Sequence, residues 1–435
     1  MSRISEIINE LNNLANGYIS VKTIKGRKYY YLQFLENGKL KSKYIKKENL
    51  IEIKKQLARR KVLENELQKI TSVGRSLPKL SKTIRKLSGY LMMGDVVVAI
   101  FDNGICTYYH EKLCPILIKR TKNISSFLSS RVIDASRTNA HLLKKALQII
   151  DESDEMISLY AHSATITDNY WFKSFKSKLK YKDISFDGDT YSDLALNGEL
   201  IAYPKVPKTT PELTTPGSFE KCWKRINDEW WLYKKGSENE IYSELFCAKV
   251  CEALKIPTAK YEYIDGYIRT KNFADKYNFE PMYSLAGDDD SYENVFNKLN
   301  ELCPDFAKEY LLLIWFDTIV NNVDRHNENC GFLRNKKNGF IYSLAPNFDN
   351  NLALISRNET LNTRPNKDGF MRYFVNFIGN NDDARKYYKT LKLPKLTAKM
   401  ISDCFKKLPY KKDEKLITNY VMGRYEYLLS LQKKI

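Results

Sequence analysis

Three runs of β-branched and aromatic residues lie between two helical patterns in the first 90 residues. Residues 4–16 carry apolar side chains at helical spacing, and residues 48–70 form a longer amphipathic stretch. Turn residues such as Asn37-Gly38 separate the strand-like runs and favour tight hairpins. Strands are expected at residues 18–24, 29–35 and 39–45. The pattern predicts a small domain of a β-meander and a helix at residues 1–80, with a basic linker or loose helix over residues 71–88.

From Tyr90 onward the pattern changes to that of a mixed α and β protein. A hairpin is expected where residues 91–101 and 105–109 flank Asp102-Asn103-Gly104. Beyond Asn294 the chain is mostly helical, apart from residues 321–356. Between these parts we expect a helix at residues 140–150, a strand at 230–234, a helix at 238–254 and a hairpin of strands 259–264 and 267–271.

Composition places the chain among folded proteins that do not enter membranes. Hydrophobic residues make up 43% and charged residues 28%, which excludes a disordered or fibrous chain. The longest apolar runs, Val96–Phe101 and Tyr310–Phe316, are far shorter than the roughly 18 residues that span a bilayer. No secretion signal is evident, and the eight cysteines are scattered without CxxC spacing. We therefore expect a reduced, cytoplasmic protein.

The basic excess is confined to one end of the chain. The net charge is +19, and residues 1–90 hold 21 Lys and Arg against 7 Asp and Glu, a local balance of +14. Tyrosines such as Tyr29, Tyr31 and Tyr44 alternate there with lysines such as Lys41 and Lys43, which on a shared sheet face would suit stacking and phosphate contacts. Tyrosine is also a good strand former, so residues 1–80 are expected to contact either nucleic acid or a protein partner.

Residues 311–354 contain three polar residues in the order that phosphoryl transfer requires. Asp324 follows an apolar helix, and Asn329 comes five residues later. Two strand-like runs then lead to Asp349. One carboxylate for the acceptor hydroxyl, with an Asn and a second carboxylate for Mg²⁺, are the parts that this chemistry needs. The structural alternative is an asparagine-rich loop that caps helix ends and turns.

The same residues resemble the motifs of the HipA-like serine/threonine kinase family. Residues 321–329 (NNVDRHNEN) and 344–349 (LAPNFD) are similar to that family's N-x-D-x-H-x-x-N and L-A-P-x-Y-D, with Phe348 in place of the usual Tyr. The resemblance extends upstream to about residue 90, through residues 166–171 and 211–221, and leaves out the first 80 residues.

The resemblance implies an α+β, bilobal protein-kinase-like fold, preceded by the small basic β-hairpin and helix domain. Its small lobe is β-rich and its large lobe helical. The implied parts are an N-terminal extension at residues 90–180, the small lobe at 181–275 and the large lobe at 276–435.

Carried over residue by residue, the resemblance makes Asp324 the catalytic carboxylate and Asn329 and Asp349 the Mg²⁺ ligands. His326 either contacts phosphate or stiffens the loop. Lys234 is expected to hold the nucleotide phosphates, with Lys235 as the alternative if the strand register differs by one residue. Either Glu240 or Glu244, on the following helix, is a candidate partner for that lysine, and surface positions are the alternative for both.

Residues 214–221 (TTPGSFEK) stand where the family has its phosphate-covering loop. Gly217 permits a tight turn near phosphate, and Lys221 adds charge. Related kinases are restrained by phosphorylation of a serine in this loop, which makes Ser218 the candidate, with Thr214 or Thr215 behind it. Residues 270–273, including Lys271 and Phe273, stand where an adenine-contacting hinge is expected.

Together with the resemblance, these features predict an ATP- and Mg²⁺-dependent kinase of protein serine or threonine. The resemblance also implies a toxin-type role, with an antitoxin partner left open. The alternative is a nucleic-acid-associated binding protein whose pseudokinase domain binds nucleotide without transferring phosphate. A kinase acting on a small molecule has no distinguishing feature in the sequence.

Overall fold

We describe a computed structural model of the chain. It divides into two compact units, residues 1–85 and 86–435. The residues described are 10, 14–15, 18–24, 27–36, 39–73, 87–147, 149–150, 152–199, 209–356, 361 and 364–435. Most of the helix expected at residues 4–16, the Asn37-Gly38 turn and most of the expected linker lie outside them.

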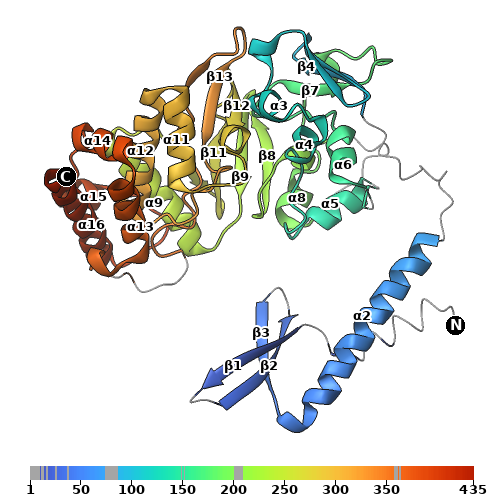
Figure 1. Cartoon of the computed structure of the whole chain (residues 1–435), viewed down its shortest axis with the longest axis horizontal. Coiled ribbons are helices and arrows are strands. Elements are labelled where there is room, and N and C mark those ends of the chain that lie inside the picture. Colours follow the sequence, from blue (N-terminus) through green and yellow to red (C-terminus); the bar gives the residue numbers. More distant parts are fainter. Residues whose placement is uncertain are drawn as a thin grey trace. The chain divides into compact units, whose positions relative to one another are not determined.

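The first unit contains an antiparallel sheet, in the order β1-β2-β3, and the long helix α2 (Figure 1). Its elements are β1 (Tyr18–Ile24), β2 (Arg27–Glu36), β3 (Lys39–Ile45), a 3-10 turn (Lys47–Asn49) and α2 (Leu50–Val73). Leu32, Ile45 and Leu63 are buried. The predicted meander and helix are thus present in the described part of this unit.

The strand register divides the tyrosines of this sheet between its two faces. Tyr31 pairs with Tyr44, and their rings lie 5.6 Å apart. Tyr29 lies 6.3 Å from the same ring. Lys43 pairs with Leu32, so it belongs to the opposite face, because successive strand residues alternate between faces. Lys41 and Lys43 therefore do not share a face with Tyr29, Tyr31 and Tyr44, but Tyr30, which pairs with Ile45, lies on their face.

The second unit begins with a sheet in the order β6-β5-β4-β7. The strands are β4 (Gly89–Met93), β5 (Val96–Asp102), β6 (Ile105–Tyr108) and β7 (Tyr170–Lys173). The single strand predicted at residues 91–101 is wrong, since β4 and β5 pair with one another. Gly94 adopts a left-handed conformation (φ +54°) and turns the chain between them.

Short helices precede and follow β7 in the chain, before the next sheet begins. They are α3 (Ile116–Thr121), α4 (Ile124–Ser129), α5 (Ala140–Ala146), α6 (Asp154–Tyr160), α7 (Tyr181–Ile184) and α8 (Ser192–Asn197). The helix predicted at residues 140–150 ends at Ala146 instead. A buried ion pair between Arg334 and Glu280 joins this region to the later strands, because Arg334 also donates to the carbonyl oxygens of Lys112 and Cys114.

The next sheet has the order β10-β11-β9-β8 and packs with α8 at β8 and with α9 at β10. Its elements are β8 (Lys221–Ile226), β9 (Glu229–Lys234), α9 (Glu238–Leu254), β10 (Tyr261–Ile264) and β11 (Tyr267–Lys271). Ser237 and Glu240 form a capping box at the start of α9, and Lys255 ends the helix in a left-handed conformation. These local signals explain why the predicted bounds of α9 match the structure.

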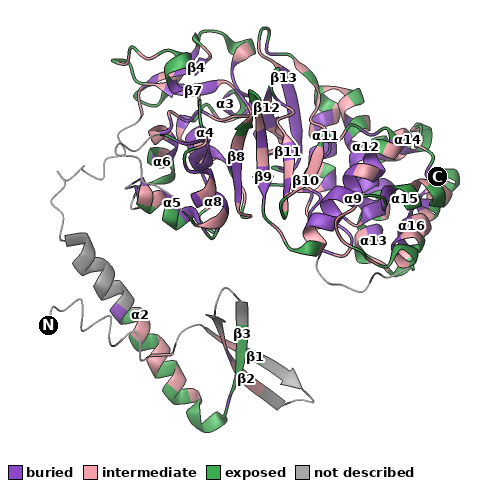
Figure 2. Cartoon of the chain, turned by 180° about the vertical axis from the view of Figure 1, so that it is seen from behind, coloured by how far each residue is buried: buried purple, intermediate pink, exposed green. Residues whose placement is uncertain are grey.

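The C-terminal part combines a sheet in the order β12-β13-β14 with a group of helices. The strands are β12 (Tyr277–Pro281), β13 (Gly331–Asn335) and β14 (Ile341–Leu344). The helices are α10 (Tyr283–Ala286), α11 (Tyr292–Leu302), α12 (Pro304–Val320), α13 (Gly369–Asn380), α14 (Asp382–Thr390), α15 (Ala398–Cys404) and α16 (Glu414–Lys434). Buried residues follow α9, α12, β8 and β13 (Figure 2).

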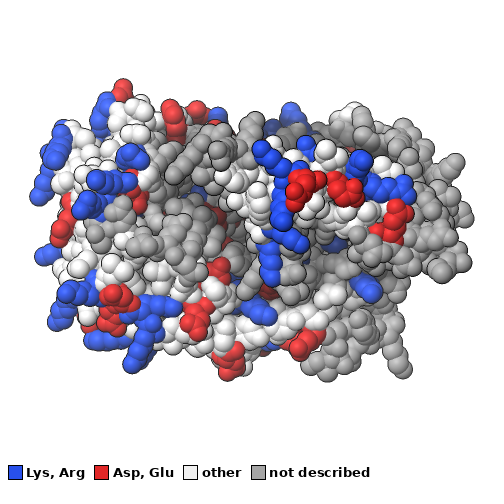
Figure 3. All heavy atoms as spheres, turned by 90° about the horizontal axis from the view of Figure 1, so that it is seen from below, with Lys and Arg blue, Asp and Glu red and all other residues white. Residues whose placement is uncertain are grey.

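Within residues 86–435 the strands β8, β9 and β11 lie between two groups of helices (Figure 1). The later helices, α11 to α16, lie on one side of β8, β9 and β11, and earlier helices such as α4 and α8 lie on the other (Figure 1). The face drawn in Figure 3 shows basic and acidic side chains interspersed. Among the described helices, none has the length and apolar character needed to cross a bilayer.

Candidate active site

All ten residues predicted for the site line one cavity of about 320 Å³. Cavities of this size and above are typical of small-molecule sites. The ten are Gly217, Ser218, Lys221, Lys234, Lys271, Phe273, Asp324, His326, Asn329 and Asp349. The extension contributes lining residues as well, among them Arg131 and Asp168.

Lys234, at the end of β9, faces the cavity. Its side chain is 9% exposed, and its Nζ lies 2.6 Å from Oδ1 of Asp349. Burial lowers the pKa of Lys234, but the charges of Asp349 and Glu244 outweigh that effect and raise the pKa above its usual value. Lys235 is exposed, and its backbone N–H donates to the carbonyl oxygen of Glu220. Of the two lysines, the structure thus brings Lys234 to the other site residues.

The two glutamates of α9 have different positions. Glu240 accepts from the backbone of Ser237 in the capping box, so it belongs to the helix start. Glu244 is fully buried, and its Oε1 accepts from the N–H of Asn350 at 2.9 Å. Burial raises the pKa of Glu244, while Lys234 acts in the opposite direction. The charge of Lys234 therefore acts on the pKa of Glu244, although the ion pair of Lys234 is with Asp349.

Asp349 is held in a strained and strongly charged environment. Its backbone is left-handed (φ +61°), and its N–H donates to the hydroxyl of Tyr261 at 3.1 Å. Burial alone would raise the pKa of Asp349, but the charges of Lys234 and Lys221 outweigh it and hold the pKa at about 2. The carboxylate is therefore ionised at neutral pH, as a metal ligand must be.

The loop after α12 brings Asp324 and Asn329 together. The helix ends at Asn321, whose left-handed conformation (φ +55°) turns the chain into the loop. Nδ2 of Asn329 donates to the backbone carbonyl of Asp324 at 3.0 Å, which leaves its Oδ1 as the atom that can serve as a ligand. Nδ1 of His326 accepts from the N–H of Glu328 at 3.2 Å, a contact that orders the loop.

Arg325 connects this loop to the loop of Asp349, a role that sequence reasoning missed. Its guanidinium binds both oxygens of Asp317 at 2.9 Å, and both side chains are buried. It also donates to the backbone carbonyls of Asn329 and Phe348, at 2.5 and 2.6 Å. The available signal was Asp317 itself, because a charged residue inside an apolar helix needs a partner.

The phosphate-loop candidate places a glycine against a buried lysine. Gly217 is left-handed (φ +97°), and a Cβ there would collide with the ammonium of Lys221. Lys221 is 6% exposed, and its ammonium has no hydrogen-bond or ion-pair partner among the described residues. Burial lowers the pKa of Lys221 to about 7, and the positive charge of Lys234 contributes. A buried cation without a counterion is suited to an anionic ligand.

The three hydroxyl residues proposed for phosphorylation differ in exposure. Ser218 is exposed. Thr214 is buried and donates to the carbonyl oxygen of Ala164 at 2.5 Å. Thr215 is also buried, and its hydroxyl donates to the carbonyl of Pro211 and accepts from Trp223. In this conformation Ser218 is the accessible one of the three.

The hinge candidates line the cavity in different ways. Lys271 uses its ammonium in an ion pair with Glu229, so its side chain is not free for a ligand. Phe273 packs on Phe348 and Phe279, with ring centroids 5.3 and 5.6 Å apart. Phe348, which replaces the expected Tyr, therefore contributes its ring to the floor of the cavity.

A cation at this site would need ligands from outside the protein. The described residues contain no group of three or more His, Cys, Asp or Glu able to hold a metal. Asp349 and Asn329 supply only two oxygen-bearing side chains. This fits Mg²⁺, which is often held by one or two carboxylates together with water and substrate phosphates.

Residues 204–409 match the family model of the HipA-like C-terminal domain. This part of the chain is HipA-like. Residues 2–55 match a second family model, described as a domain of unknown function (DUF6788). A search of curated proteins finds no match.

Two solved structures resemble the chain. HipA of Shewanella oneidensis MR-1, solved as a toxin–antitoxin complex with HipB and operator DNA, matches with a TM-score of 0.50 and 13% identity. The match covers 80% of this chain and 97% of that one. The proinflammatory kinase CtkA of Helicobacter pylori matches with a TM-score of 0.40 and 16% identity, over 49% of this chain and 93% of that one. The HipA match shows that the chain shares the α+β fold of HipA.

Proposed function

We propose that residues 86–435 catalyse ATP- and Mg²⁺-dependent phosphoryl transfer to serine or threonine of a protein. The observation that carries the proposal is that Lys234, Asp324, Asn329 and Asp349 line one cavity beside the unpartnered Lys221. Two cations, two carboxylates and an amide oxygen at one point match the demands of phosphoryl transfer, which rests on positioning and charge stabilisation.

Each residue has a separate task in this proposal. Lys234 and Lys221 bind the phosphates of ATP, and the 270–273 segment with Phe273 takes the adenine. Asp349 and Asn329 hold Mg²⁺, which when bound neutralises phosphate charge. Asp324 orients the acceptor hydroxyl and accepts its proton while the hydroxyl oxygen bonds to the γ-phosphorus and the β–γ bridging bond breaks, leaving ADP.

Self-restraint through the phosphate loop is part of the proposal. Ser218 is exposed at this loop and carries a hydroxyl that can accept phosphate. A phosphate there would add about two negative charges beside Lys221, at the place proposed for ATP. The toxin-type role, with a neutralising partner protein, is proposed on the likeness to HipA, whose structure contains HipB.

The proposal is tested by incubating the purified chain with ATP and Mg²⁺ and measuring intact mass. We expect one or more added phosphates, mapped to Ser218 or its neighbours. Asp324→Asn is expected to slow transfer by about 10² to 10⁴-fold, because it removes the proton acceptor. Asp349→Ala should abolish transfer. Absence of phosphate on the chain and on added protein substrates, together with absence of Mg²⁺-dependent ATP binding, would contradict the assignment.

The first unit favours a second candidate function, binding of nucleic acid. Tyr29, Tyr31 and Tyr44 share one face of the sheet, and Tyr44 is 50% exposed. Aromatic rings in a strongly basic unit suit stacking on bases. Nucleic acid is also present in the structure of the HipA relative. If the chain binds ATP and nucleic acid but transfers no phosphate, it is instead a nucleic-acid-associated pseudokinase.

A further inference from the structure

An arginine of the extension binds the backbone of the phosphate loop. The guanidinium of Arg137 donates to three successive carbonyl oxygens, at 2.6 Å to Thr215, 3.1 Å to Pro216 and 2.9 Å to Gly217. Its Nε also donates to Gly217, at 3.1 Å. Arg137 lies 80 residues before Gly217 in the chain, so the contact joins two distant segments.

Arg137 is buried without a carboxylate partner. Only 2% of the residue is exposed, and no salt bridge of Arg137 occurs in the part of the chain that the structure describes. Burial lowers its pKa to about 10. A buried guanidinium bound only by carbonyl oxygens is costly to desolvate. Its position is therefore better explained by what it does to the loop than by a gain in stability.

The contacts of Arg137 determine which way the loop amides point. The C=O and N–H of a trans peptide unit point in opposite directions, and the described chain has no cis peptide. Because the carbonyls of Pro216 and Gly217 point to Arg137, the N–H groups of Gly217 and Ser218 point to the other side, where both residues line the cavity. Neither N–H has an acceptor among the described residues. Paired amides of this kind form an anion-binding site.

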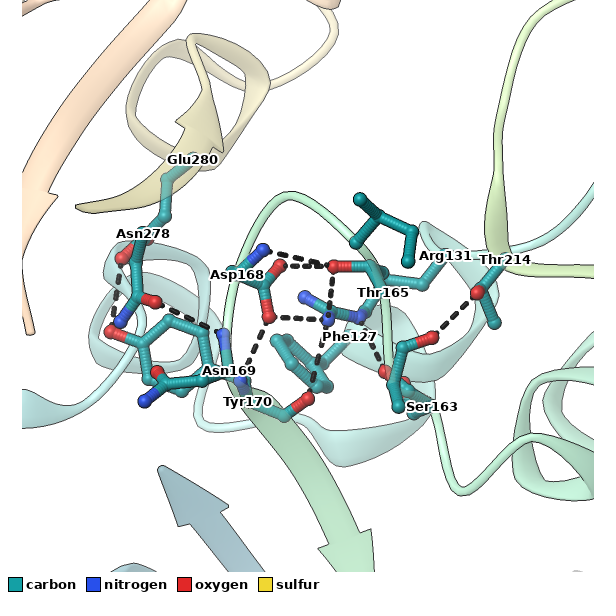
Figure 4. Close-up of polar contacts among 12 residues, drawn as sticks. Phe127, Arg131, Ser163, Thr165, Asp168, Asn169, Tyr170, Thr214, Asn278 and Glu280 are labelled. Atoms are coloured by element: carbon teal, nitrogen blue, oxygen red, sulfur yellow. Dashed lines mark hydrogen bonds and ion pairs between the residues drawn. The ribbon is translucent and has the colours of Figure 1, made fainter. Parts of the chain in front are cut away.

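The extension also holds the beginning of the loop. Thr214 donates to the carbonyl of Ala164, as noted above. The segment around Ala164 is fixed by Arg131, which binds Asp168 at 2.7 Å and the carbonyl of Ser163 at 3.0 Å (Figure 4). The loop is thus attached to the extension at Thr214 and again at residues 215–217.

We propose that Arg137 is a positioning residue that presets residues 214–218 for nucleotide phosphates. It turns the Gly217 and Ser218 amides toward the cavity, beside the Lys221 ammonium, before any nucleotide binds. The extension then contributes to nucleotide binding through Arg137, although it lies outside the two proposed kinase lobes. This inference rests on the proposed function.

The test compares the affinities of ATP, ADP and adenosine for the full chain by calorimetry. Arg137→Met should weaken ATP and ADP by about tenfold to a hundredfold, the loss expected when hydrogen bonds to charged groups are misaligned. The affinity of adenosine should not change, because adenosine lacks phosphates. Arg137→Lys should fall between the two, since an ammonium lacks the planar fork by which Nε and Nη2 of Arg137 both bind the carbonyl of Gly217.

Arg424→Met is the matched control. Arg424 is a fully buried arginine of α16 that donates to the carbonyl of Thr318 and pairs with Asp368. This variant should lose stability and keep its ATP affinity. If Arg137→Met does not fold, the comparison is made with Arg137→Lys.

The outcomes separate the two proposals. Unchanged ATP affinity in both Arg137 variants, or equal losses for ATP and adenosine, would overturn the positioning role alone. A wild-type chain that binds neither ATP nor adenosine would instead contradict the proposed function.

Discussion

Two buried lysines on neighbouring strands face the cavity, and they differ in their partners. Lys221 on β8 is the cross-strand partner of Lys234 on β9. Asp349 forms an ion pair with Lys234, whereas the ammonium of Lys221 has no hydrogen-bond or ion-pair partner among the described residues. Two adjacent cations repel one another, and burial adds to the cost. An arrangement that weakens the folded protein is expected where a ligand supplies the missing negative charge.

We predict that Lys221→Met stabilises the protein and weakens ATP binding. The pKa of Lys221 in the folded chain is about 7, below its usual value of 10.5. The unfolded state therefore binds more protons between these values, and the cost of burying Lys221 decreases as pH rises. The melting temperature of the variant should exceed that of the wild type, and by more at pH 6 than at pH 9. A lower melting temperature at pH 6 would contradict this explanation.

The apolar helix α12, the loop of Asp324 and the loop of Asp349 act as one element because of Arg325. Asp317 on the helix holds the guanidinium, which in turn holds a carbonyl of each loop. Removing one member of a buried ion pair leaves the other charge without compensation, at a cost of about 3–5 kcal/mol. The distance between Asn329 and Asp349 also depends on this connection.

We therefore expect Arg325→Met to lose both stability and ATP binding. Urea unfolding should show a fall of about 3–5 kcal/mol in the free energy of unfolding. Lys235→Met, an exposed change near the same site, should stay within about 0.5 kcal/mol of the wild type. A loss for Arg325→Met no greater than that of the control would show that the two loops are held by other contacts.

At the scale of the whole molecule, the two compact units are expected to have separable activities. The basic excess belongs to the first unit, so binding to DNA or RNA should weaken steeply with salt, with a slope set by the number of phosphates contacted. Deleting residues 1–80 should abolish nucleic-acid binding and leave ATP affinity unchanged. Nucleic-acid binding that survives the deletion would place that surface in residues 86–435.

Much of this arrangement follows from local sequence, and the remainder depends on distant contacts. The aromatic residues of β9 and the capping box of α9 suffice to predict both elements, whereas the choice of Lys234 came from the family resemblance. The spacing from Asp324 to Asn329 is also local. Both residues belong to the one loop after α12, where the side chain of Asn329 donates to the carbonyl of Asp324. The contribution of Arg137 could not be predicted, because no local pattern relates it to Gly217. The turn at Gly94 was missed since apolar residues continue on both sides of it.

In the proposed nucleotide complex, Lys221 and Lys234 face the phosphates. An acyl-phosphate derivative of ATP acylates the lysine that lies nearest its phosphates, and the modified peptide can be identified by mass spectrometry. We expect a label on Lys221 or Lys234 that excess ATP prevents and that Lys235 does not receive. A label on other lysines only, or one that ATP does not prevent, would contradict this placement.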